Sequence, residues 1–429
     1  MFINESFISF IWQFSYFDLA DLTLVNGQKL EILSPGHANI HSGPDFNDAK
    51  IRIDGLTWIG AVEIHVQSSY WDFHHHQQNN DYNKVILHVV WKYDRPVLRS
   101  DGSELPTLEL HFRVSENLIH RYRNLVYVPG EKIACSTQLD RIKEVTLPGM
   151  IQKALIRRLE RKSHEIDRLL NECSNDWDQT AYRWVVRNFG FKVNQDNMYL
   201  LSRIVPLKLL LRLGNDPVKM EAMLFGVAGF LEEEKDDYQR KLKDEYTFLR
   251  HKYQLECNFL KRYQWKFLRL HPQNFPTVRI AQLAAFIARL NNFFSLIIQT
   301  KDTGRIYRDF QVSQSAYWQT HYDFGAPAKK KLTGLGKFSI DNLMINSIAP
   351  LLVAYGRFTD NITYVDQAVA LLEKIRYENN WIIRKWKMLG IEIRNASDSQ
   401  GLIELYNHYC YKKKCLNCNI GTEILLNIN

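Results

Sequence analysis

Apolar and polar residues alternate along the first third of the chain, whereas apolar residues recur every three or four positions along much of the remainder. Two alternating runs between residues 49 and 66 flank Asp54-Gly55, a pair that favours a tight hairpin turn. In the second run apolar side chains share one face, and the opposite face carries Glu63 and His65. The pattern predicts a β-hairpin whose second strand has a core face and a polar face.

The same reading predicts a mixed α/β domain followed by helices. The front part should contain a helix capped by Asn4, a hairpin around Asn26-Gly27, a strand covered on both faces and a further alternating strand, over residues 5–17, 22–33, 85–91 and 107–112. The main helices expected after about Leu147 are Met150–Leu170, Glu232–Leu270, Val278–Ile298 and Tyr364–Ile375. The expected fold class is α+β, with a mixed α/β domain over residues 1–145 and an all-α domain over residues 146–429.

Length and composition indicate a folded, non-membrane protein. A chain of 429 residues, 45% hydrophobic and 13% aromatic, can bury a large core. It contains no apolar run of about eighteen residues and does not begin with a basic, apolar leader. Its six cysteines suit a reducing compartment better than a disulfide scaffold. We therefore expect a cytoplasmic protein that does not interact with a membrane.

The net charge of +8 is unevenly distributed along the chain. Residues 1–145 contain 13 Lys/Arg and 18 Asp/Glu, whereas the remainder contains 42 Lys/Arg and 29 Asp/Glu. A basic helical half beside an acidic front half is compatible with a bound polyanion, and equally with ordinary Lys/Arg-rich helix surfaces. Nucleic acid is the partner that the first interpretation predicts.

Two acidic residues occupy positions that the hairpin would bring together. Asp45 lies just before the first strand and Glu63 lies on the second. Paired carboxylates facing one point can bind Mg²⁺ or Mn²⁺, which polarises a phosphoryl oxygen and lowers the pKa of bound water. His65, two residues after Glu63, could orient or activate that water.

These residues resemble the signature of the PD-(D/E)xK nuclease superfamily. Pro44-Asp45 matches its PD element, and Glu63-Ile64-His65 matches its Glu-x-Lys element with histidine in the lysine position. The resemblance implies a restriction-endonuclease-like mixed-sheet domain that cleaves DNA or RNA phosphodiesters with Mg²⁺. Asp45 and Glu63 would bind the metal and, with His65, form the catalytic set. The alternative is a degenerate nuclease fold that binds nucleic acid, or serves in assembly, without turnover.

A second resemblance covers most of the chain. It rests on five strings that are similar to a bacterial family, domain of unknown function 2851: Gly43-Pro44-Asp45-Phe46, Trp58 through His65, Ser68-Ser69, Val85 through Val90, and Asn274 through Leu283. This family would place Asp-Trp after the serine pair, whereas the chain has Tyr70-Trp71, followed by Asp72. The resemblance implies no activity by itself.

Further histidines and acids are candidates for the same site. His74 and His76 follow the hairpin closely, and His88 lies in the apolar strand, where a core role is the simpler interpretation. A zinc-type hydrolase using His65, His74 and His88 is therefore a third hypothesis. Glu5 and Glu31 could approach from the first helix and first strand.

Three cysteines near the C-terminus form a compact motif, Cys410-x4-Cys415-x2-Cys418. A Cys-x2-Cys pair suits Zn²⁺ or an iron–sulfur cluster, and some branches of the nuclease superfamily carry such a cluster. A closed site needs a fourth ligand, for which Cys257, Cys173, Cys135 and His408 are candidates. The alternative is that the thiols are small apolar groups closing a helix end.

Basic residues on the helices and loops are candidates for contact with nucleic-acid phosphates. Arg157 and Arg158 belong to a basic helix, and Lys330 and Lys331 to a lysine run beside several glycines. The aromatic residues interleaved with such stretches are more typical of core positions than of base-stacking platforms.

Overall fold

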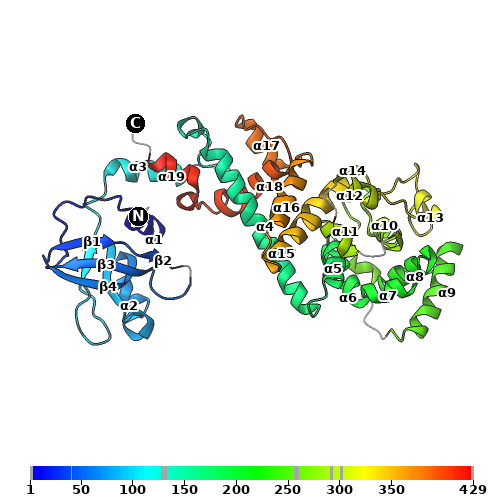
Figure 1. The fold of residues 1–429 in the computed structure, drawn as a ribbon, viewed down its shortest axis with the longest axis horizontal. Helices are drawn as coiled ribbons and strands as arrows, with labels where there is room; N and C mark the ends of the chain where they lie inside the picture. The colour runs from blue at the N-terminus through cyan, green and yellow to red at the C-terminus, as the bar shows by residue number, and fades with distance from the viewer. Residues whose placement is uncertain are drawn as a thin grey trace. The chain divides into compact units, whose positions relative to one another are not determined.

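The chain forms two compact units in a computed structural model that describes residues 3–39, 41–126, 133–255, 260–289, 293–299 and 303–426. The first unit comprises residues 1–150 together with 405–429, and the second comprises residues 151–404 (Figure 1). The predicted second domain, 146–429, differs from the observed second unit mainly at its C-terminal end. That segment returns to the first unit through contacts that are distant in sequence.

A mixed sheet is the centre of the first unit. Its strands are β1 (Leu30–Ser34), β2 (His37–Ala38), β3 (Phe46–Ile53), β4 (Leu56–Gln67), β5 (Val85–Lys92) and β6 (Thr107–Glu109). The order is β1-β3-β4-β5-β6, and β2 also pairs with β3. The β1, β3 and β4 strands pair antiparallel, whereas β4, β5 and β6 pair parallel. The structure thus has the predicted mixed α/β character.

The predicted hairpin forms around Asp54-Gly55. These residues have φ angles of 43° and 87°, the positive pair that a two-residue hairpin turn of type I′ requires. The predicted central strand is also confirmed, because β5 is buried at every position except Lys92 and has a parallel neighbour on each side. The first predicted hairpin is reduced to a bridge between Thr23 and Lys29, since β1 pairs with β3 instead.

Strand β4 differs from the prediction in one respect that matters for the site. Its residues from Ala61 to His65 are all buried, so the polar face is enclosed as well as the apolar face. The covering segment is the crossover to β5, which contains α2 (Tyr70–Phe73) and the turns η1 (His76–Gln78) and η2 (Asn80–Tyr82). Alternation along a strand identifies its two faces but does not show what covers each face.

Helix α1 (Glu5–Phe14) begins at the predicted cap, where the Asn4 side chain accepts a hydrogen bond from the Phe7 amide at 3.0 Å. It ends three residues earlier than predicted, at Ser15 in the left-handed conformation. The Phe7 ring stacks on Tyr122 of α3 (Glu116–Val126) with ring centroids 4.2 Å apart.

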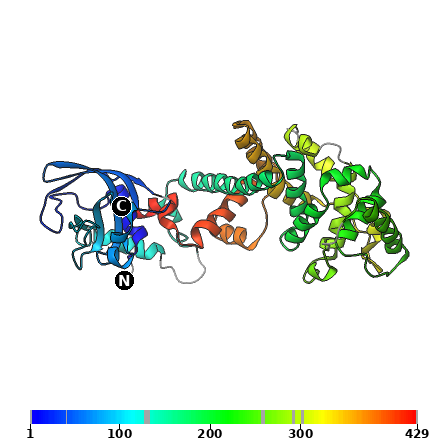
Figure 2. The ribbon, with the colours of Figure 1, turned by 90° about the horizontal axis from the view of Figure 1, so that it is seen from below.

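The C-terminal segment packs on the first unit through α19 (Asn419–Leu426), which contacts α3. Glu423 on α19 accepts a hydrogen bond from the Lys143 amide at 2.8 Å and another from the Thr146 hydroxyl. Both views show the C-terminal helix, in red, beside α3 (Figures 1 and 2). These bonds hold the returning segment at the point where the chain enters α4 (Thr146–Glu172).

Helices make up most of the second unit, which α4 enters. They are α5 (Trp177–Phe189), α6 (Gln195–Ile204), α7 (Leu207–Arg212), α8 (Pro217–Val227), α9 (Asp237–Lys252), α10 (Pro276–Arg289), α11 (Phe293–Gln299), α12 (Thr303–Phe310), α13 (Ala316–Thr320), α14 (Lys337–Leu343), α15 (Ala349–Phe358), α16 (Thr363–Glu373), α17 (Trp381–Met388) and α18 (Ala396–Leu405). A small hairpin of β7 (His321–Asp323) and β8 (Ala326–Pro327) shows that this unit is not strictly all-α.

The long helix expected over Glu232–Leu270 is wrong in its bounds. Helix α9 begins only after Asp236, whose side chain accepts a hydrogen bond from the Gln239 amide at 2.8 Å and so caps the helix. It ends at Lys252, and Gln254 has a positive φ of 51°. The amphipathic spacing was correct, but the capping residue determined where the helix starts.

Within the described residues one helical stretch, Lys337–Phe358, is long and apolar enough to cross a membrane. Its most apolar window is 67% buried inside the protein, as in a core helix.

A buried glutamate in α8 makes the stability of the second unit depend on pH. Glu221 is 1% exposed and accepts hydrogen bonds from Tyr238 and Trp318 at 2.8 and 2.9 Å. Burial raises the pKa of this carboxyl from 4.5 to about 7, although the hydrogen bonds from Tyr238, Ser315 and Trp318 oppose the rise. The neutral acid is therefore the form that the fold favours.

We predict that Glu221→Gln removes this pH dependence. Because the folded-state pKa is raised, the carboxyl stabilises the fold fully below pH 4.5, and this contribution is lost as the pH rises to about 7. Relative to the variant, the wild-type free energy of unfolding should fall by roughly 3 kcal/mol between pH 4.5 and 8. Urea unfolding at several pH values measures this difference. The exposed Glu373→Gln on α16 is the control, and a wild-type-minus-variant difference independent of pH would contradict the assignment.

Candidate metal site on β4

The predicted acidic pair comes together through reciprocal hydrogen bonds. Phe46 pairs with Val62 across the hairpin, so Asp45, just before β3, lies beside Glu63 on β4. The Asp45 amide donates to Glu63 Oε2 at 3.1 Å, and the Ile64 amide donates to Asp45 Oδ2 at 3.0 Å. Each carboxylate is thus held by the backbone of the other strand.

The environment of this pair strongly favours protonation when no cation is present. Burial and the neighbouring Glu63 raise the pKa of Asp45 from 3.8 to about 7. Burial also raises the pKa of Glu63 from 4.5 to about 8, with the nearby Glu5 adding to the rise. Ionising two carboxyl groups that are buried side by side costs free energy, because their negative charges repel each other in a site with little water. A bound cation would offset this cost.

His65 lies on the same face of β4 as Glu63, two residues further along the strand. Its Nδ1 is 2.8 Å from Nε2 of His88, whose backbone pairs with Glu63 in the parallel ladder. Burial lowers the pKa of His65 to about 2 and that of His88 to about 3, with neighbouring imidazoles contributing, so both rings are neutral. Neutral imidazole is the form that binds a metal.

The crossover segment brings two more imidazoles to this face. His75 has a positive φ of 59°, and His74 and His76 reach the site from either side of this backbone bend. His74 and His75 are exposed, whereas His76 is buried. His65 Nε2 is 3.1 Å from His74 Nδ1, and His76 Nε2 is 3.2 Å from Glu63 Oε1. Three consecutive histidines therefore contribute two site residues, because the middle one adopts the left-handed conformation.

Aromatic rings and a polar clamp hold the crossover in place. Tyr82 stacks on His76 with ring centroids 3.8 Å apart, and Trp71 packs edge-on against the same imidazole. Asp94, after β5, accepts hydrogen bonds from both hydroxyls of the Ser68-Ser69 pair at 2.6 Å. The serine pair thus anchors the first turn of the crossover.

The arrangement fits a metal bound by nitrogen and one carboxylate oxygen. Among the described residues, His65, His74 and His76 form a group whose ligand atoms all lie within 4.8 Å of one another. Glu63 Oε1 lies 3.6 Å from His65 Nε2 as well as 3.2 Å from His76 Nε2. Ligands bound to Zn²⁺ in a tetrahedron are separated by about 3.3 Å, since zinc–nitrogen bonds are about 2.0–2.1 Å.

One unsatisfied atom and one tautomer support this fit. The buried Nε2 of His76 makes no hydrogen bond, so its lone pair is available to a metal. A metal on His65 Nε2 requires the proton on Nδ1, which then donates to His88 Nε2. In that arrangement His88 would orient His65 and would not itself bind the metal, unlike in the predicted trio of His65, His74 and His88.

Of the two outlying glutamates that were predicted, one lies near the site and the other pairs elsewhere. Glu5 in the first turn of α1 lies near the site. Burial raises its pKa, and the nearby His74 and His76 oppose the rise. Glu31 on β1 instead forms an ion pair with Arg52, the residue opposite it on β3. The register of β1 on β3 thus directs Glu31 to an exposed partner.

The predicted thiol ligands lie apart from these histidines. Cys410, Cys415 and Cys418 lie in the first unit together with Cys135, whose pKa is raised by burial and then by Cys418 and Cys415. Cys173 is buried in the second unit and His408 lies on the turn η7 (Tyr406–Cys410), whereas Cys257 lies outside the described residues.

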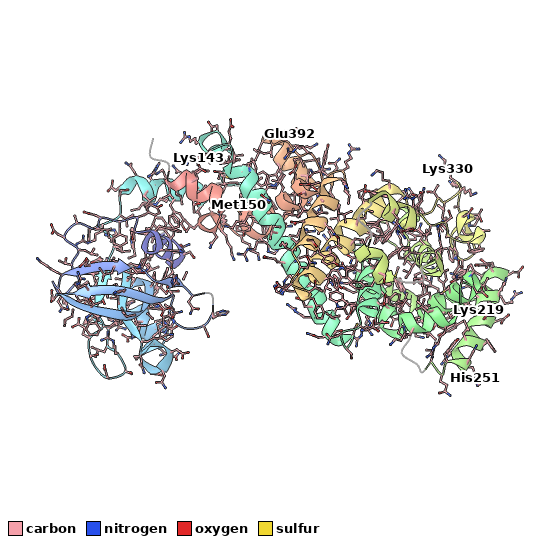
Figure 3. All side chains as sticks on the ribbon, viewed as in Figure 1. Lys143, Met150, Lys219, His251, Lys330 and Glu392 are labelled. Atoms are coloured by element: carbon pink, nitrogen blue, oxygen red, sulfur yellow. The ribbon has the colours of Figure 1, made fainter. Side chains whose placement is uncertain are left out.

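The basic residues proposed for phosphate contact fall into two classes. Arg158 is largely buried, 3.6 Å from Glu404, whereas Arg157 is 65% exposed beside Glu160. Lys330, labelled in Figure 3, and Lys331 lie on an exposed loop of the second unit. Lys331 also lines a cavity of about 720 Å³ together with residues 332–337.

Sequence reasoning missed the residues that position the histidines. Trp71 and Tyr82 are not usual metal ligands, and their packing on His76 follows from the fold of the crossover. Asp94 reaches the crossover only because β5 pairs with β4, and its carboxylate accepts hydrogen bonds from the serine pair. The Ser68-Ser69 pair was visible as part of a motif, but its partner Asp94 was not.

Comparison with known proteins identifies the family. The chain belongs to the family described as a protein of unknown function (DUF2851), whose model matches residues 5–381. No curated protein and no solved structure is found to match it.

We predict that metal binding at this site releases protons near neutral pH. The pKa values of Asp45 and Glu63, about 7 and about 8, mean that protons compete with the metal below these values. Affinity for Co²⁺ should rise about tenfold per pH unit for each proton released and should level off above pH 8. Calorimetric titration in two buffers of different ionisation enthalpy counts the protons. Affinity unchanged between pH 6 and 8 would refute the competition.

Two variants test whether Asp45 is a source of the released protons. Asp45→Asn should reduce the number of protons released, whereas Asp48→Asn should not change it. Asp48 is exposed on the same strand and has a φ of 58°, a conformation that asparagine tolerates.

We also predict that Arg158 serves stability. Arg158→Ala leaves the buried Glu404 with fewer partners and should lower the free energy of unfolding by about 1–3 kcal/mol. Arg157→Ala, on the exposed side of the same helix, should change it by less than about 0.5 kcal/mol. Urea unfolding of the two variants measures both values, and equal effects would contradict the distinction.

Proposed function

We propose that this member of the family is a metal-dependent hydrolase of nucleic-acid phosphodiesters, with its metal held on β4 and the adjoining crossover. The observation that carries the proposal is the convergence of His65, His74 and His76 on the Glu63 carboxylate. Such a set of nitrogen and oxygen donors suits Zn²⁺, Mn²⁺ or Co²⁺ better than Mg²⁺, which prefers oxygen ligands and keeps several waters. The histidines thus favour a softer ion than the acidic pair alone would.

The proposed ligands are Glu63, His65, His74 and His76. A divalent ion bound there would polarise a phosphoryl oxygen and lower the pKa of a water molecule. His88 orients His65 through the 2.8 Å contact between their ring nitrogens. The aromatic rings of Trp71 and Tyr82 pack on His76 and so hold its imidazole in position.

Asp45 is the carboxylate beside the proposed ligand set. Its backbone amide donates a hydrogen bond to Glu63 Oε2, so the position of Asp45 is coupled to that of the proposed ligand Glu63. In the proposed reaction Asp45 accepts the proton of the attacking water and Glu5 adds negative charge nearby. This assignment keeps both acidic residues of the resemblance in the site. Of the two, only Glu63 is a ligand of the metal, together with the three histidines.

Two features support a phosphodiester substrate. Asp45 precedes one strand of a hairpin and Glu63 lies on the other, as the PD-(D/E)xK signature requires. The residues after 145 carry 42 Lys/Arg against 29 Asp/Glu, an excess that favours a polyanionic partner. The exposed Arg157, Lys330 and Lys331 are the proposed phosphate contacts.

The second candidate function is nucleic-acid binding without turnover. It is favoured by His65 at the position where the nuclease signature has lysine, because a neutral imidazole lacks a permanent positive charge. The two functions differ in one measurable result, which is cleavage of the bound strand.

We predict metal-dependent cleavage that requires Asp45. The full chain, incubated with plasmid, single-stranded DNA and RNA, should cut at least one substrate with Mn²⁺, Co²⁺ or Zn²⁺ and less with Mg²⁺ alone. Asp45→Asn should lower the rate by about 10²-fold or more, because it removes the proton acceptor. Gel analysis of time courses measures the rate.

Asp48→Asn is the matched control and should cut as the wild type does. Equal cleavage by wild type and Asp45→Asn would reject the site as the source of activity. Binding of nucleic acid without cleavage under every metal would favour the second candidate.

A further inference from the structure

A second group of potential metal ligands lies in the first unit and includes residues from both ends of the chain. Cys135 follows α3, and the other thiols belong to the C-terminal segment that returns to this unit. Helix α19, which follows Cys418, contacts α3, and its Glu423 accepts hydrogen bonds from Lys143 and Thr146, so the returning segment lies against the segment that carries Cys135. Burial raises the pKa of Cys410, and Cys135, Cys418 and Cys415 add to the rise. The turn between α3 and α4 thus supplies the fourth thiol that the sequence motif lacks.

The local backbone places these thiols around a tight loop. Cys410 ends the π-helical turn η7, Lys413 has a positive φ of 52°, and Cys415 begins the short helix η8 (Cys415–Asn417). A side chain at Gly421 would meet the Cys415 carbonyl oxygen at 2.2 Å, so α19 packs closely against this loop. The close packing fixes two cysteines relative to the helix.

Burial separates the thiols from solvent. Cys135, Cys415 and Cys418 are 7–8% exposed, and Cys410 is half-buried. A metal would displace the thiol protons, because the thiolate is the form that coordinates.

We propose that Cys135, Cys410, Cys415 and Cys418 form a four-thiolate metal site that ties the returning C-terminal segment to the first unit. The ligand class is a soft thiolate-bound centre, either one Zn²⁺ or an iron–sulfur cluster. The Cys-x2-Cys pair formed by Cys415 and Cys418 provides the spacing typical of such centres.

Binding would draw the four sulfurs closer together. Among the described residues, only the group of His65, His74 and His76 has ligand atoms within 4.8 Å of one another, so no three of the thiols meet this limit. Zinc–sulfur bonds of about 2.3 Å place ligand sulfurs roughly 3.8 Å apart. The metal therefore acts as a clamp that tightens the loop around η8.

The site is independent of the proposed hydrolase, and the experiment separates the two. The full chain is purified without oxygen and without chelator, and its zinc, iron and acid-labile sulfide are measured per chain. In His76→Ala, which removes a ligand of the proposed hydrolase site, we expect zinc near one equivalent, or iron with matching sulfide, and we expect this metal to be lost in His76→Ala/Cys135→Ser. Cys173→Ser, which alters a buried cysteine of the second unit, is the matched control and should retain the metal.

Cobalt substitution gives a second readout that does not depend on the variants folding well. Co²⁺ bound to the wild type at these thiols should show sulfur-to-cobalt charge-transfer absorption, which a histidine and carboxylate site lacks. The same bands should remain in His76→Ala. Zinc and iron both below one tenth of an equivalent, together with no charge-transfer absorption on adding Co²⁺ to the reduced wild type, would overturn the proposal. Metal retained by a folded His76→Ala/Cys135→Ser would also overturn it.

Discussion

The enclosed polar face of β4 is the constraint on which the first unit depends. A carboxylate or imidazole removed from water must find partners, since an unpaired buried polar group costs several kcal/mol or shifts its protonation state. The reciprocal bonds between Asp45 and the Glu63 strand, and the pairing of His65 with His88, meet part of that demand. Two buried nitrogens, Nε2 of His76 and Nδ1 of His88, still make no hydrogen bond. The His76 nitrogen lies 3.2 Å from Glu63 Oε1, an arrangement that a bound cation at this point would satisfy.

This constraint explains the architecture around the strand. The crossover between β4 and β5 is short and polar, yet it packs Trp71 and Tyr82 onto imidazoles. Its first turn is clamped to Asp94 by the serine pair, so the segment carrying the histidines is fixed at the sheet end. The parallel pairing of β4 with β5 then brings His88 beside the same cluster. Each feature serves to hold side chains that would otherwise favour solvent.

Much of the local structure could be predicted because it depends on neighbours in sequence. The Asp54-Gly55 turn, the Asn4 cap and the buried run of β5 each follow from the conformational preferences of a few residues. The extent of α9 was misjudged, because the Asp236 cap competed with a longer amphipathic pattern. Glu31 was misplaced for a different reason: its partner, Arg52, depends on strand register.

The sequence by itself determined the strands, the turn between them and the candidate chemistry of Asp45, Glu63 and His65, because these follow from alternation and residue type. Only the tertiary structure decided which histidines converge, since that depended on the left-handed His75 and on the packing of the crossover. It also decided that residues 133–146, which include Cys135, lie against the returning C-terminal segment. Contacts between residues far apart in the chain arise from the packing of whole elements, which no local pattern encodes.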